Sequence, residues 1–478
     1  MKIELFTLNG SYAHSSLAVR CLSTALREAG FDCVHITEAT LRDRTATVLS
    51  RLVEADADLY SFSSYIWNIA ELLSLARDLK AVHPGAKIVF GGPEVSFDCD
   101  RFASLHFIDT VITGEGERAL VELARTLQAG KPLPQLLAGT PDPHFCTCGT
   151  HYPETEPISS LVYYEGSRGC PYCCTFCLSS TASGVRAKSA EKVLEDLLEF
   201  ERFEKPLTVK LVDRTFNFDP ERAKAIWRGL LSPSFTKCYH FEISAPLLDE
   251  ESFLILSQFP KGKIRLEIGL QSTNEKTLAA VCRHASADKT LSAAARLKAA
   301  GNVHVHLDLI AGLPFEDYRS FANSFDAAYP HCDVLQLGFL KLLHGTALHR
   351  DAEKYGILAS RTPPYTVLKT AWLTFREIDR LRGISGILDR LQEKGRFAHT
   401  LHFVSQHFSS AFSFFEGILD YLKNEDGREL QNISQRNLFG HIWSYTKSRV
   451  SPQAHSELRD RLVADFCAAE ARKPPKFE

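Results

Sequence analysis

Short β-like runs of apolar residues alternate with helical spacings of apolar residues through the first 130 residues. Residues 3–8 form the first run, and apolar residues at 17, 21, 22 and 26 then share one helical face. Gly30 stands where a glycine commonly ends a helix. Further β-like runs follow at 33–36, 59–62, 87–90 and 111–112, with a helix predicted near 69–79. This alternation predicts an α/β domain with a doubly wound parallel sheet, whose ligand site lies at the carboxyl ends of the strands.

A second alternating pattern begins after a proline-rich stretch. Prolines at 132, 134, 141, 143, 153 and 157 exclude a long helix and predict a linker over residues 131–160. Six β-like runs separated by helical patterns then follow, at 162–164, 209–212, 240–243, 264–270, 304–310 and 335–339. These repeats predict a partial (β/α)6 barrel of the TIM type over residues 161–350, with its chemistry at the C-terminal mouth of the strands.

The alternation stops near residue 351. Leu368, Ala371, Trp372, Phe375 and Ile378 have helical spacing, so we expect a mainly helical domain over residues 351–478. Aromatic residues are frequent there, and core packing is favoured over an apolar pocket for Phe403, Phe408, Phe412, Phe414, Phe415 and Tyr421.

Length and charge indicate a multidomain protein and disfavour two classes of partner. A chain of 478 residues has room for about two to four folded units. Its 55 basic and 58 acidic side chains leave a net charge of -3, so no overall positive field attracts nucleic acid or an anionic membrane surface. The longest apolar stretch, 334–343, contains Gln336 and Lys341 and is too short to cross a bilayer. Residues 1–6 lack the features of a signal peptide, so a cytoplasmic protein is expected.

Four of the 13 cysteines lie in one short segment, Cys170-Pro-Tyr-Cys173-Cys174-Thr-Phe-Cys177. In a reducing compartment such a cluster more often indicates metal than a disulfide. The spacing Cys-x3-Cys-x2-Cys suits three thiolates that hold three irons of a [4Fe-4S] cluster and leave the fourth iron open. A zinc site and a chance thiol cluster are the alternatives, although zinc usually takes a fourth Cys or His. Cys173 is expected to be a spectator, because its ligation would fill the open position.

The glycine-rich loops of the first domain do not carry the dinucleotide fingerprint. Gly114-Glu-Gly116 continues as Glu-Arg-Ala, so G-x-G-x-x-G is absent and a nicotinamide cofactor is disfavoured. Loops rich in Gly and Ser nevertheless suit a large ligand that approaches the backbone, although any flavodoxin-like sheet needs glycine at such turns.

The cysteine motif in this barrel context resembles the radical S-adenosylmethionine enzymes. Phe176, just before the last cysteine, matches that family, and so do four later stretches: Leu211-Val-Asp213-Arg-Thr-Phe-Asn217, Phe241-Glu242-Ile-Ser244, Glu267-Ile-Gly-Leu-Gln271-Ser272 and Asp308-Leu-Ile-Ala-Gly312-Leu-Pro314. The resemblance implies that S-adenosylmethionine chelates the open iron and that its reductive cleavage gives a 5'-deoxyadenosyl radical. Three stretches together resemble those of a bacterial subgroup that carries a C-terminal domain of unassigned function: Tyr164-Glu-Gly-Ser-Arg-Gly-Cys-Pro, Val212-Asp-Arg-Thr-Phe and His306-Leu-Asp-Leu-Ile-Ala-Gly-Leu-Pro.

The resemblance also assigns S-adenosylmethionine contacts in the barrel. Acidic and polar side chains at the strand ends are candidates for its ammonium and ribose: Asp213, Glu242, Ser244, Glu267 and Gln271. Arg283 is a candidate partner of the methionyl carboxylate, with a surface ion pair as its alternative. Asp308 and Gly312 are expected beside the nucleoside, with ordinary barrel turn chemistry as their alternative.

The first domain resembles the Rossmann-like cobalamin-binding domain that precedes many of these barrels. The resemblance implies corrin neighbours at Ser63, Ser64, Gly91, Gly92, Pro93, Glu94 and Gly114. The motif Asp-x-His-x-x-Gly is missing, so a cobalt without protein imidazole is expected. His14 is the nearby imidazole, and a loop or capping role is favoured for it. Cys146 and Cys148 could bind a metal, but a linker pair is the favoured interpretation, because two thiols alone are weak evidence.

These features lead to one main functional prediction and two alternatives. The resemblance implies a cobalamin-dependent radical methyltransferase that acts on an unactivated carbon through the adenosyl radical and methylcobalamin. A radical rearrangement, cyclisation or oxidation without methyl transfer is the second hypothesis, and a non-catalytic cobalamin or iron-sulfur sensor is the third. The expected partners are a small-molecule or peptide substrate and an external electron donor such as flavodoxin or ferredoxin. The loops near Ser63 and Gly92 are expected to face the barrel mouth near Cys174 and Gln271.

Overall fold

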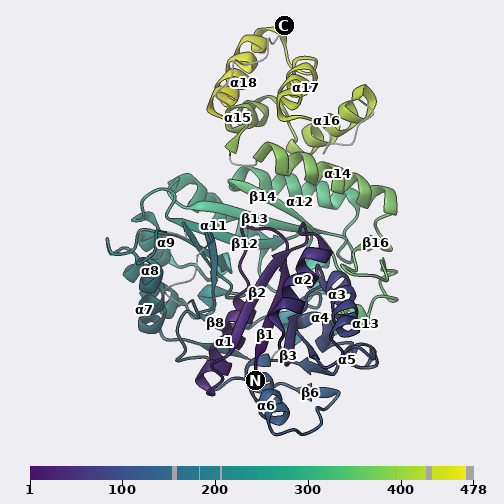
Figure 1. Ribbon diagram of the computed structural model, residues 1–478. Helices are drawn as coiled ribbons and strands as arrows, with labels where there is room; N and C mark the ends of the chain where they lie inside the picture. Colours follow the sequence, from purple (N-terminus) through teal and green to yellow (C-terminus); the bar gives the residue numbers. More distant parts are fainter. Residues whose placement is uncertain (153–158, 182–183, 205–206, 393–394, 427–432, 470–478) are drawn as a thin grey trace. The chain divides into compact units, whose positions relative to one another are not determined.

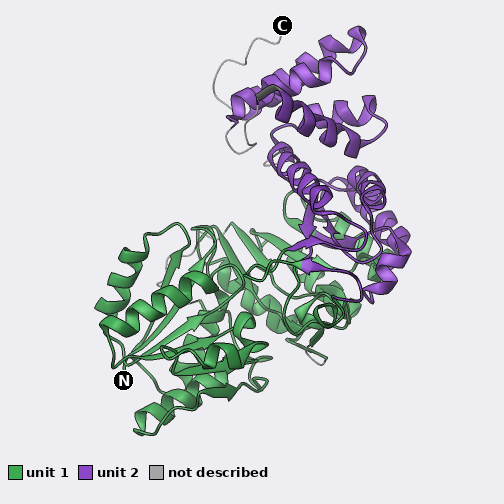
Figure 2. Ribbon diagram, turned by 90° about the vertical axis from the view of Figure 1, so that its right-hand side faces the viewer, with its two compact units in different colours: residues 1–266, 341–352, 359–366 green, residues 267–340, 353–358, 367–478 purple. Residues whose placement is uncertain are grey.

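The computed structural model describes residues 1–152, 159–181, 184–204, 207–392, 395–426 and 433–469 (Figure 1). Pro153 and Pro157, two prolines of the expected linker, lie outside these ranges. The chain divides into two compact units (Figure 2): residues 1–266, 341–352 and 359–366 form the first, and residues 267–340, 353–358 and 367–478 form the second.

The first unit opens with a parallel sheet of six strands. In spatial order they are β2 (Val34–Thr40), β1 (Ile3–Asn9), β3 (Leu59–Ser63), β4 (Lys87–Gly91), β5 (Thr110–Thr113) and β6 (Leu136–Ala138). The strand order reverses between β1 and β3, as in a flavodoxin-like sheet. The predicted doubly wound sheet is confirmed. Strand β6 lies within the proline-rich stretch, where the sequence suggested only a linker.

Helices cover both faces of this sheet, because successive side chains of each strand point to opposite faces. Leu5 packs with the helices of one face, and its neighbour Phe6 packs with those of the other. The first face carries α1 (Leu17–Glu28) and α6 (Gly116–Gln128). The second carries α2 (Thr45–Ala55), α3 (Ile69–Val82) and α5 (Cys99–Ala103), with the short α4 (Pro93–Ser96) after β4.

A second six-stranded sheet corresponds to the predicted barrel. Its strands, in spatial order, are β14 (Val334–Phe339), β13 (His304–Ala311), β12 (Ile264–Gln271), β11 (Cys238–Ile243), β10 (Thr208–Leu211) and β7 (Leu161–Tyr164). Helices alternate with the strands along the chain: α7 (Ala190–Phe200), α8 (Pro220–Leu230), α9 (Glu250–Ser257), α10 (Glu275–Ala280), α11 (Ala287–Ala300) and α12 (Tyr318–Ala328). All six predicted strands are present, so the partial barrel is confirmed.

The C-terminal part is mainly helical, as predicted. After α13 (Ala347–Arg350) and the short strands β15 (Leu358–Ala359) and β16 (Val367–Lys369), it contains α14 (Phe375–Gln392), α15 (Ala398–His407), α16 (Ala411–Asp426), α17 (Gln435–Lys447) and α18 (His455–Ala469). The preference for core packing is confirmed for Phe403, Phe412, Phe414 and Phe415, which are all buried. Within the described residues, no helix is both long and apolar enough to span a membrane.

One helical prediction is wrong at its beginning. Leu368 lies in β16, and Ala371 and Trp372 precede α14, which begins at Phe375. The helix begins there because Thr374 and Glu377 form a capping box: the Thr374 N–H donates to the Glu377 carboxylate at 2.8 Å, and the Glu377 N–H donates to the Thr374 hydroxyl at 3.3 Å. Apolar spacing continues through this cap, so the spacing alone did not locate it.

Candidate functional site

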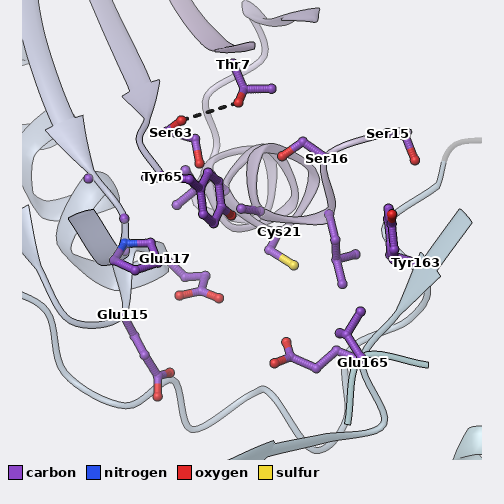
Figure 3. Close-up of a pocket in the computed structure, with 18 of the residues that line it drawn as sticks. Thr7, Ser15, Ser16, Cys21, Ser63, Tyr65, Glu115, Glu117, Tyr163 and Glu165 are labelled. Atoms are coloured by element: carbon purple, nitrogen blue, oxygen red, sulfur yellow. Dashed lines mark hydrogen bonds between the residues drawn. The ribbon is translucent and has the colours of Figure 1, made fainter. Parts of the chain in front are cut away.

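A cavity of about 880 Å³ lies at the carboxyl ends of β1 and β3, where the strand order of the first sheet reverses. A doubly wound sheet binds its ligand at this place. Figure 3 shows Thr7 on β1 and Ser63 on β3, where the Thr7 hydroxyl donates to the Ser63 carbonyl at 3.3 Å. Glycine and serine residues are frequent in this wall, which contains Gly10, Ser15, Ser16, Ser61, Gly91, Gly92, Gly114 and Gly116. The volume lies at the upper end of the range for ligand pockets, which indicates a large ligand.

Gly92 shapes the loop after β4. Its φ is +111°, and a Cβ at this position would lie 2.4 Å from the carbonyl oxygen of Ser64, so only glycine fits. Ser64 is fully buried, and its N–H and its hydroxyl both donate to the Gly91 carbonyl, at 2.8 and 2.7 Å. The loops after β3 and β4 are therefore joined by direct backbone contacts.

The structure separates the seven expected corrin neighbours into two groups. Five of them line the cavity: Ser63, Gly91, Gly92, Pro93 and Gly114. Ser64 braces the wall from behind, and Glu94 is buried, where it accepts a hydrogen bond from the Tyr365 hydroxyl. Burial raises the pKa of Glu94. Neither Ser64 nor Glu94 reaches the cavity in the described structure.

An aromatic pair in the loop after β3 was missed by the sequence reasoning. Tyr65 and Trp67 both line the cavity, and their rings stack at 4.3 Å with an interplanar angle of 7°. Asn68, which is fully buried, holds this loop: its amide donates to the carbonyls of Leu8 and Ser63 at 3.1 and 3.2 Å and accepts from the Tyr65 N–H at 2.7 Å. An asparagine soon after a strand was the available signal for such a turn.

The second sheet supplies another wall of the same cavity. Tyr163 on β7, Lys210 on β10 and Glu242 on β11 line it, and the Lys210 ammonium lies 3.4 Å from the Glu242 carboxylate. These residues alternate with buried neighbours along their strands, so they occupy one face of the sheet. Figure 3 shows Tyr163 of this wall together with Ser63 of the first sheet. The loops of Ser63 and Gly92 thus share the cavity with β7, β10 and β11, but neither Cys174 nor Gln271 lines it, so the expectation that these two residues face the loops stays a prediction.

His14 also lines the cavity, in the loop after β1. Its Nδ1 lies 2.6 Å from the Tyr163 hydroxyl, and the two rings are stacked. His14 therefore connects a loop of the first sheet with a strand of the second, and one of its ring nitrogens is already engaged.

Arg168 forms the charged part of the cavity wall. Its guanidinium lies 2.8 Å from Glu115, 2.9 Å from Glu117 and 2.8 Å from Glu165. These carboxylates raise the pKa of Arg168, although burial acts in the opposite direction. Glu115 and Glu117 belong to the loop after β5 and the start of α6, whereas Glu165 and Arg168 directly precede the cysteine segment. The network therefore links the first sheet to that segment.

The cysteine segment is closed at its base by two short antiparallel strands, β8 (Ser167–Gly169) and β9 (Val185–Ala187). Arg168 and Arg186 are paired across these strands, and both bind the Glu115 carboxylate. Gly169 has a φ of +105°, and a Cβ there would lie 2.2 Å from the Gly184 carbonyl oxygen. The close approach of the two strands therefore requires glycine at position 169.

The four cysteines of this segment differ in exposure. Cys174 is buried, Cys170 and Cys177 are half-buried, and Cys173 is exposed. The Cys170 sulfur lies 3.6 Å from the hydroxyl of Thr215, which follows β10, and the Cys177 N–H donates to the Cys174 carbonyl at 3.1 Å. Among the described residues, no group of three or more His, Cys, Asp or Glu is placed to hold a single metal ion, and Cys146 and Cys148 belong to no such group.

Asp213 organises the backbone before the cysteines. It is fully buried and accepts hydrogen bonds from the Gly166 N–H and the Ser167 hydroxyl, both at 2.7 Å. Arg222 lies 3.8 Å from its carboxylate. Burial raises the pKa of Asp213 to about 6, although Arg222 opposes the shift. Asp213 therefore positions the loop that leads to Cys170 and does not line the cavity.

Ser244, another predicted contact, lies beside the cysteine segment. Its hydroxyl accepts from the Tyr172 hydroxyl at 3.1 Å. Asn217 holds its backbone, accepting from the Ser244 N–H at 2.9 Å and donating to its carbonyl at 3.0 Å. The end of β11 is thus tied both to the segment after β10 and to the cysteine loop.

The second unit contains the remaining predicted residues. Arg283 donates to the Gly269 carbonyl, and a Cβ on Gly269 would lie 2.3 Å from the Gln271 amide nitrogen and 3.1 Å from the Arg283 guanidinium. Gln271 has a φ of +71°, and its amide oxygen is buried without a hydrogen-bond partner in the described structure. Glycine at 269 therefore makes room for Gln271 and Arg283 side by side.

Three further predicted residues lie on or directly after two adjacent strands, β12 and β13. Glu267 on β12 and Asp308 on β13 are half-buried and alternate with buried apolar neighbours. Gly312 follows β13 with a φ of +95°, and a Cβ there would meet the Leu340 and Val367 side chains at 3.5 and 3.7 Å. The sharp turn after β13, rather than lack of space, requires glycine at this position.

Glu316 supports the loop after Gln271. It is fully buried and accepts hydrogen bonds from the hydroxyls of Ser272 at 2.6 Å and Ser324 at 3.2 Å. Burial raises the pKa of Glu316 to about 7. The sequence reasoning did not single out this residue, because a Glu in a loop ordinarily indicates a solvated position.

Stability of the protein is expected to fall as the pH rises from near 4.5 to near 7, because Glu316 holds its proton more tightly in the folded state than in the unfolded chain. The contribution of Glu316 to the free energy of unfolding is fully present below its pKa in the unfolded chain. It is lost as the pH rises to its pKa in the folded protein, a difference of roughly 3 kcal/mol. Urea unfolding across this pH range is the measurement. Glu316→Gln should flatten that part of the profile, and an unchanged profile in the variant would contradict the assignment.

Comparison with known protein families divides the chain into three matched regions. Residues 5–124 match the B12 binding domain, residues 164–328 match the radical SAM superfamily, and residues 353–477 match a domain described as a protein of unknown function, DUF4080.

Three curated proteins are similar to parts of the chain. A 2-(S-pantetheinyl)-carbapenam-3-carboxylate methyltransferase of Streptantibioticus cattleyicolor is 28% identical over 56% of this chain and 44% of its own length. The cobalamin-dependent radical SAM methyltransferase TokK of Streptomyces tokunonensis is 27% identical over 60% of this chain and 47% of its own length. The hopanoid C-3 methylase of Methylococcus capsulatus is 25% identical over 62% of this chain and 60% of its own length. The chain thus spans less than half the length of the first two relatives.

Solved structures share the fold at low sequence identity. The cobalamin-dependent S-adenosylmethionine radical enzyme OxsB matches 99% of this chain and 81% of its own, with a TM-score of 0.66 and 14% identity. The radical S-adenosylmethionine methyltransferase TsrM of Kitasatospora setae matches 77% of this chain and 80% of its own, with a TM-score of 0.62 and 18% identity.

Proposed function

We propose that the chain is a cobalamin-dependent radical S-adenosylmethionine methyltransferase that acts on an unactivated carbon, because residues 5–124 match the B12 binding domain and residues 164–328 match the radical SAM superfamily. The main support for this proposal is that strand ends of the first sheet and strands β7, β10 and β11 of the second sheet line the same cavity. Two reactive centres must lie within one substrate's reach of each other for a two-step transfer. The methyltransferase relatives support this reading.

The residues present fit cobalamin in the first sheet. Glycines at 10, 91, 92, 114 and 116 leave one wall of the cavity without side chains, which lets a large ring system approach the backbone. The hydroxyls of Ser15, Ser16 and Ser63 are placed on the same wall to bond the amide groups at its edge. We therefore assign residues 1–130 to cobalamin binding.

The cysteine loop and the polar strand ends fit the other two cofactors. Cys170, Cys174 and Cys177 would hold the cluster, since the β8–β9 pair gathers them on one closed loop. The buried, unpartnered amide oxygen of Gln271 requires a donor, which the ribose hydroxyls of S-adenosylmethionine supply, and Arg283 beside it would bind the carboxylate. We assign residues 161–350 to this chemistry, residues 131–160 to the linker and residues 351–478 to the C-terminal domain.

The chain's own residues would organise the reaction. When bound, the cluster and S-adenosylmethionine supply a hydrogen-abstracting radical, and cobalamin supplies the methyl group. Asp213 fixes the backbone that leads to Cys170, and Glu115 holds both strands at the base of the cysteine loop. The stacked Tyr65 and Trp67 supply an aromatic surface to the cavity against which an apolar part of a ligand can pack. We further propose a cytoplasmic enzyme with a small-molecule or peptide substrate and an external electron donor such as flavodoxin or ferredoxin.

Product stoichiometry tests the proposal. After anaerobic reconstitution with iron, sulfide and cobalamin, methylation should consume two molecules of S-adenosylmethionine per turnover and form 5'-deoxyadenosine and S-adenosylhomocysteine in equal amounts. Mass spectrometry would identify methylated metabolites or peptides. 5'-Deoxyadenosine without S-adenosylhomocysteine would favour a rearrangement, cyclisation or oxidation. Intact S-adenosylmethionine under strong reductant would favour a sensor.

Cob(II)alamin bound to the protein is expected to lack nitrogen hyperfine splitting from an imidazole in its electron paramagnetic resonance spectrum. The ground for this expectation is the missing Asp-x-His-x-x-Gly motif. His14 is the residue to test, because it lines the cavity and only its Nδ1 is engaged, by the Tyr163 hydroxyl at 2.6 Å. His14→Ala should leave this spectrum unchanged. A splitting in the unmodified protein that disappears in His14→Ala would show that His14 binds the cobalt.

A further inference from the structure

Charged residues of the cavity wall are paired with one exception. Arg168 is matched with Glu115, Glu117 and Glu165, and Lys210 is matched with Glu242. Within the part of the chain that the structure describes, the remaining cation in the lining, Arg214, has neither an ion-pair nor a side-chain hydrogen-bond partner.

Arg214 is presented by a rigid backbone. The residue before it, Asp213, is fully buried, with two hydrogen bonds to the loop that leads to the cysteines. The residue after it, Thr215, is buried, and its hydroxyl donates to the Arg214 carbonyl at 2.8 Å and lies 3.6 Å from the Cys170 sulfur. The Arg214 side chain itself is exposed and lines the cavity. Both neighbours are held in place, so the backbone from which the Arg214 side chain extends into the cavity is fixed.

Arg214 lies close in the chain to a residue that contacts the cysteine segment, and it lines the cavity beside the first sheet. It is one residue from Thr215, which contacts Cys170, and it shares the cavity with Tyr65 and the glycine loops of the first sheet. Its positive charge also reaches Tyr65, whose pKa burial raises and Arg214 lowers. A group bound to Arg214 would therefore stand beside the cysteine loop and inside the cavity.

We propose that Arg214 binds an anionic oxygen group, a carboxylate or a phosphate, of the substrate that is methylated. A guanidinium presents a planar fork of N–H donors that matches these groups with two parallel hydrogen bonds. Because the exposed Arg214 guanidinium has no counter-ion in the described cavity wall, it can pair with an anionic group of a ligand that enters the cavity. The inference rests on the proposed function and narrows it to an anionic substrate class.

Chemical protection tests the anion site without knowledge of the substrate. The full chain, reconstituted with cluster and cobalamin, would be treated with phenylglyoxal, and modification of Arg214 would be followed by peptide mass spectrometry. Malonate and inorganic phosphate should each slow the labelling of Arg214 but not that of Arg51, an exposed arginine on α2. Equal labelling of Arg214 with and without these anions would overturn the proposal.

A second arm separates the substrate from S-adenosylmethionine, which also carries a carboxylate. S-adenosylmethionine alone should not protect Arg214, and Arg214→Gln should bind it as tightly as the unmodified protein does. The proposal would be overturned if S-adenosylmethionine protected Arg214 from labelling, or if Arg214→Gln bound S-adenosylmethionine more weakly than the unmodified protein does. Arg51→Gln is the matched control, and both variants should unfold at the same temperature as the unmodified protein.

A third arm uses methyl-labelled S-adenosylmethionine and a metabolite extract divided on an anion-exchange resin. Labelled product should come from the retained fraction. Arg214→Gln should lower the rate at limiting concentrations of this fraction by about 10- to 100-fold, with partial recovery in Arg214→Lys. Product from the unretained fraction alone would overturn the inference but keep the proposed function. Absence of methyl transfer from every fraction would count against the proposed function, while the protection arm still decides the anion site.

Discussion

Alanine at Cys170, Cys174 or Cys177 is expected to abolish assembly of the [4Fe-4S] cluster, because each substitution leaves one iron without its thiolate. Cys174 is buried and Cys170 is held beside Thr215, so no other thiol of the loop replaces them without rearrangement. Iron and sulfide analysis after anaerobic reconstitution, with the electron paramagnetic resonance spectrum of the reduced protein, would measure the loss. S-adenosylmethionine cleavage should be lost in the same three variants.

Cys173→Ala is the matched control, since Cys173 is adjacent to Cys174 but exposed. This variant should retain the cluster and its spectrum. If Cys173→Ala lost the cluster and Cys174→Ala kept it, the ligands would be Cys170, Cys173 and Cys177, and the exposure of Cys173 would not have indicated its role.

Gly92→Ala is expected to weaken cobalamin binding by about 10- to 100-fold, because the new Cβ would lie 2.4 Å from the Ser64 carbonyl oxygen at a φ of +111°. Relief of this clash must move the loop after β4 away from the loop after β3, and both loops line the cavity. Absorbance titration of the full chain with cobalamin would measure the dissociation constant.

Gly91→Ala provides a control in the same loop and the same wall. Its Cβ would meet the Ile112 side chain and carbonyl at 3.8 Å, an ordinary contact. We expect Gly91→Ala to bind cobalamin within a few-fold of the unmodified protein. Equal weakening by both substitutions would mean that the added methyl groups obstruct the ligand itself, and equal retention would mean that the Gly92 loop is not part of the binding wall.

The spacing of apolar residues along the chain was sufficient to predict most of the architecture of this protein. Alternating apolar runs identified the first five strands of the first sheet and all six strands of the second, because apolar periodicity reports which faces of an element are buried. The exceptions have local causes as well. β6 is a three-residue strand at the sheet edge among prolines, and the capping box at Thr374 interrupts an apolar spacing that continues through it.

Only part of the candidate site could be predicted from the sequence. The spacing of the cysteines predicted the cluster, the resemblance supplied the polar strand ends, and the glycine loops of the first sheet do line the cavity. It did not distinguish residues that line the cavity from residues that brace it. Ser64 and Asp213 are fully buried supports, a distinction that depends on which backbone groups approach them.

The sequence by itself determined the two sheets, the helical C-terminal part and the segment that carries the cysteines, since each depends on residues close together in the chain. Only the tertiary structure decided which charges meet in the cavity. Glu115 bonds Arg168 and Arg186 across separations of 53 and 71 residues, and Arg214 is left without a partner in the described wall. No local pattern encodes such pairs, because they form when the packing of two sheets brings distant loops together and buries their charges in one place.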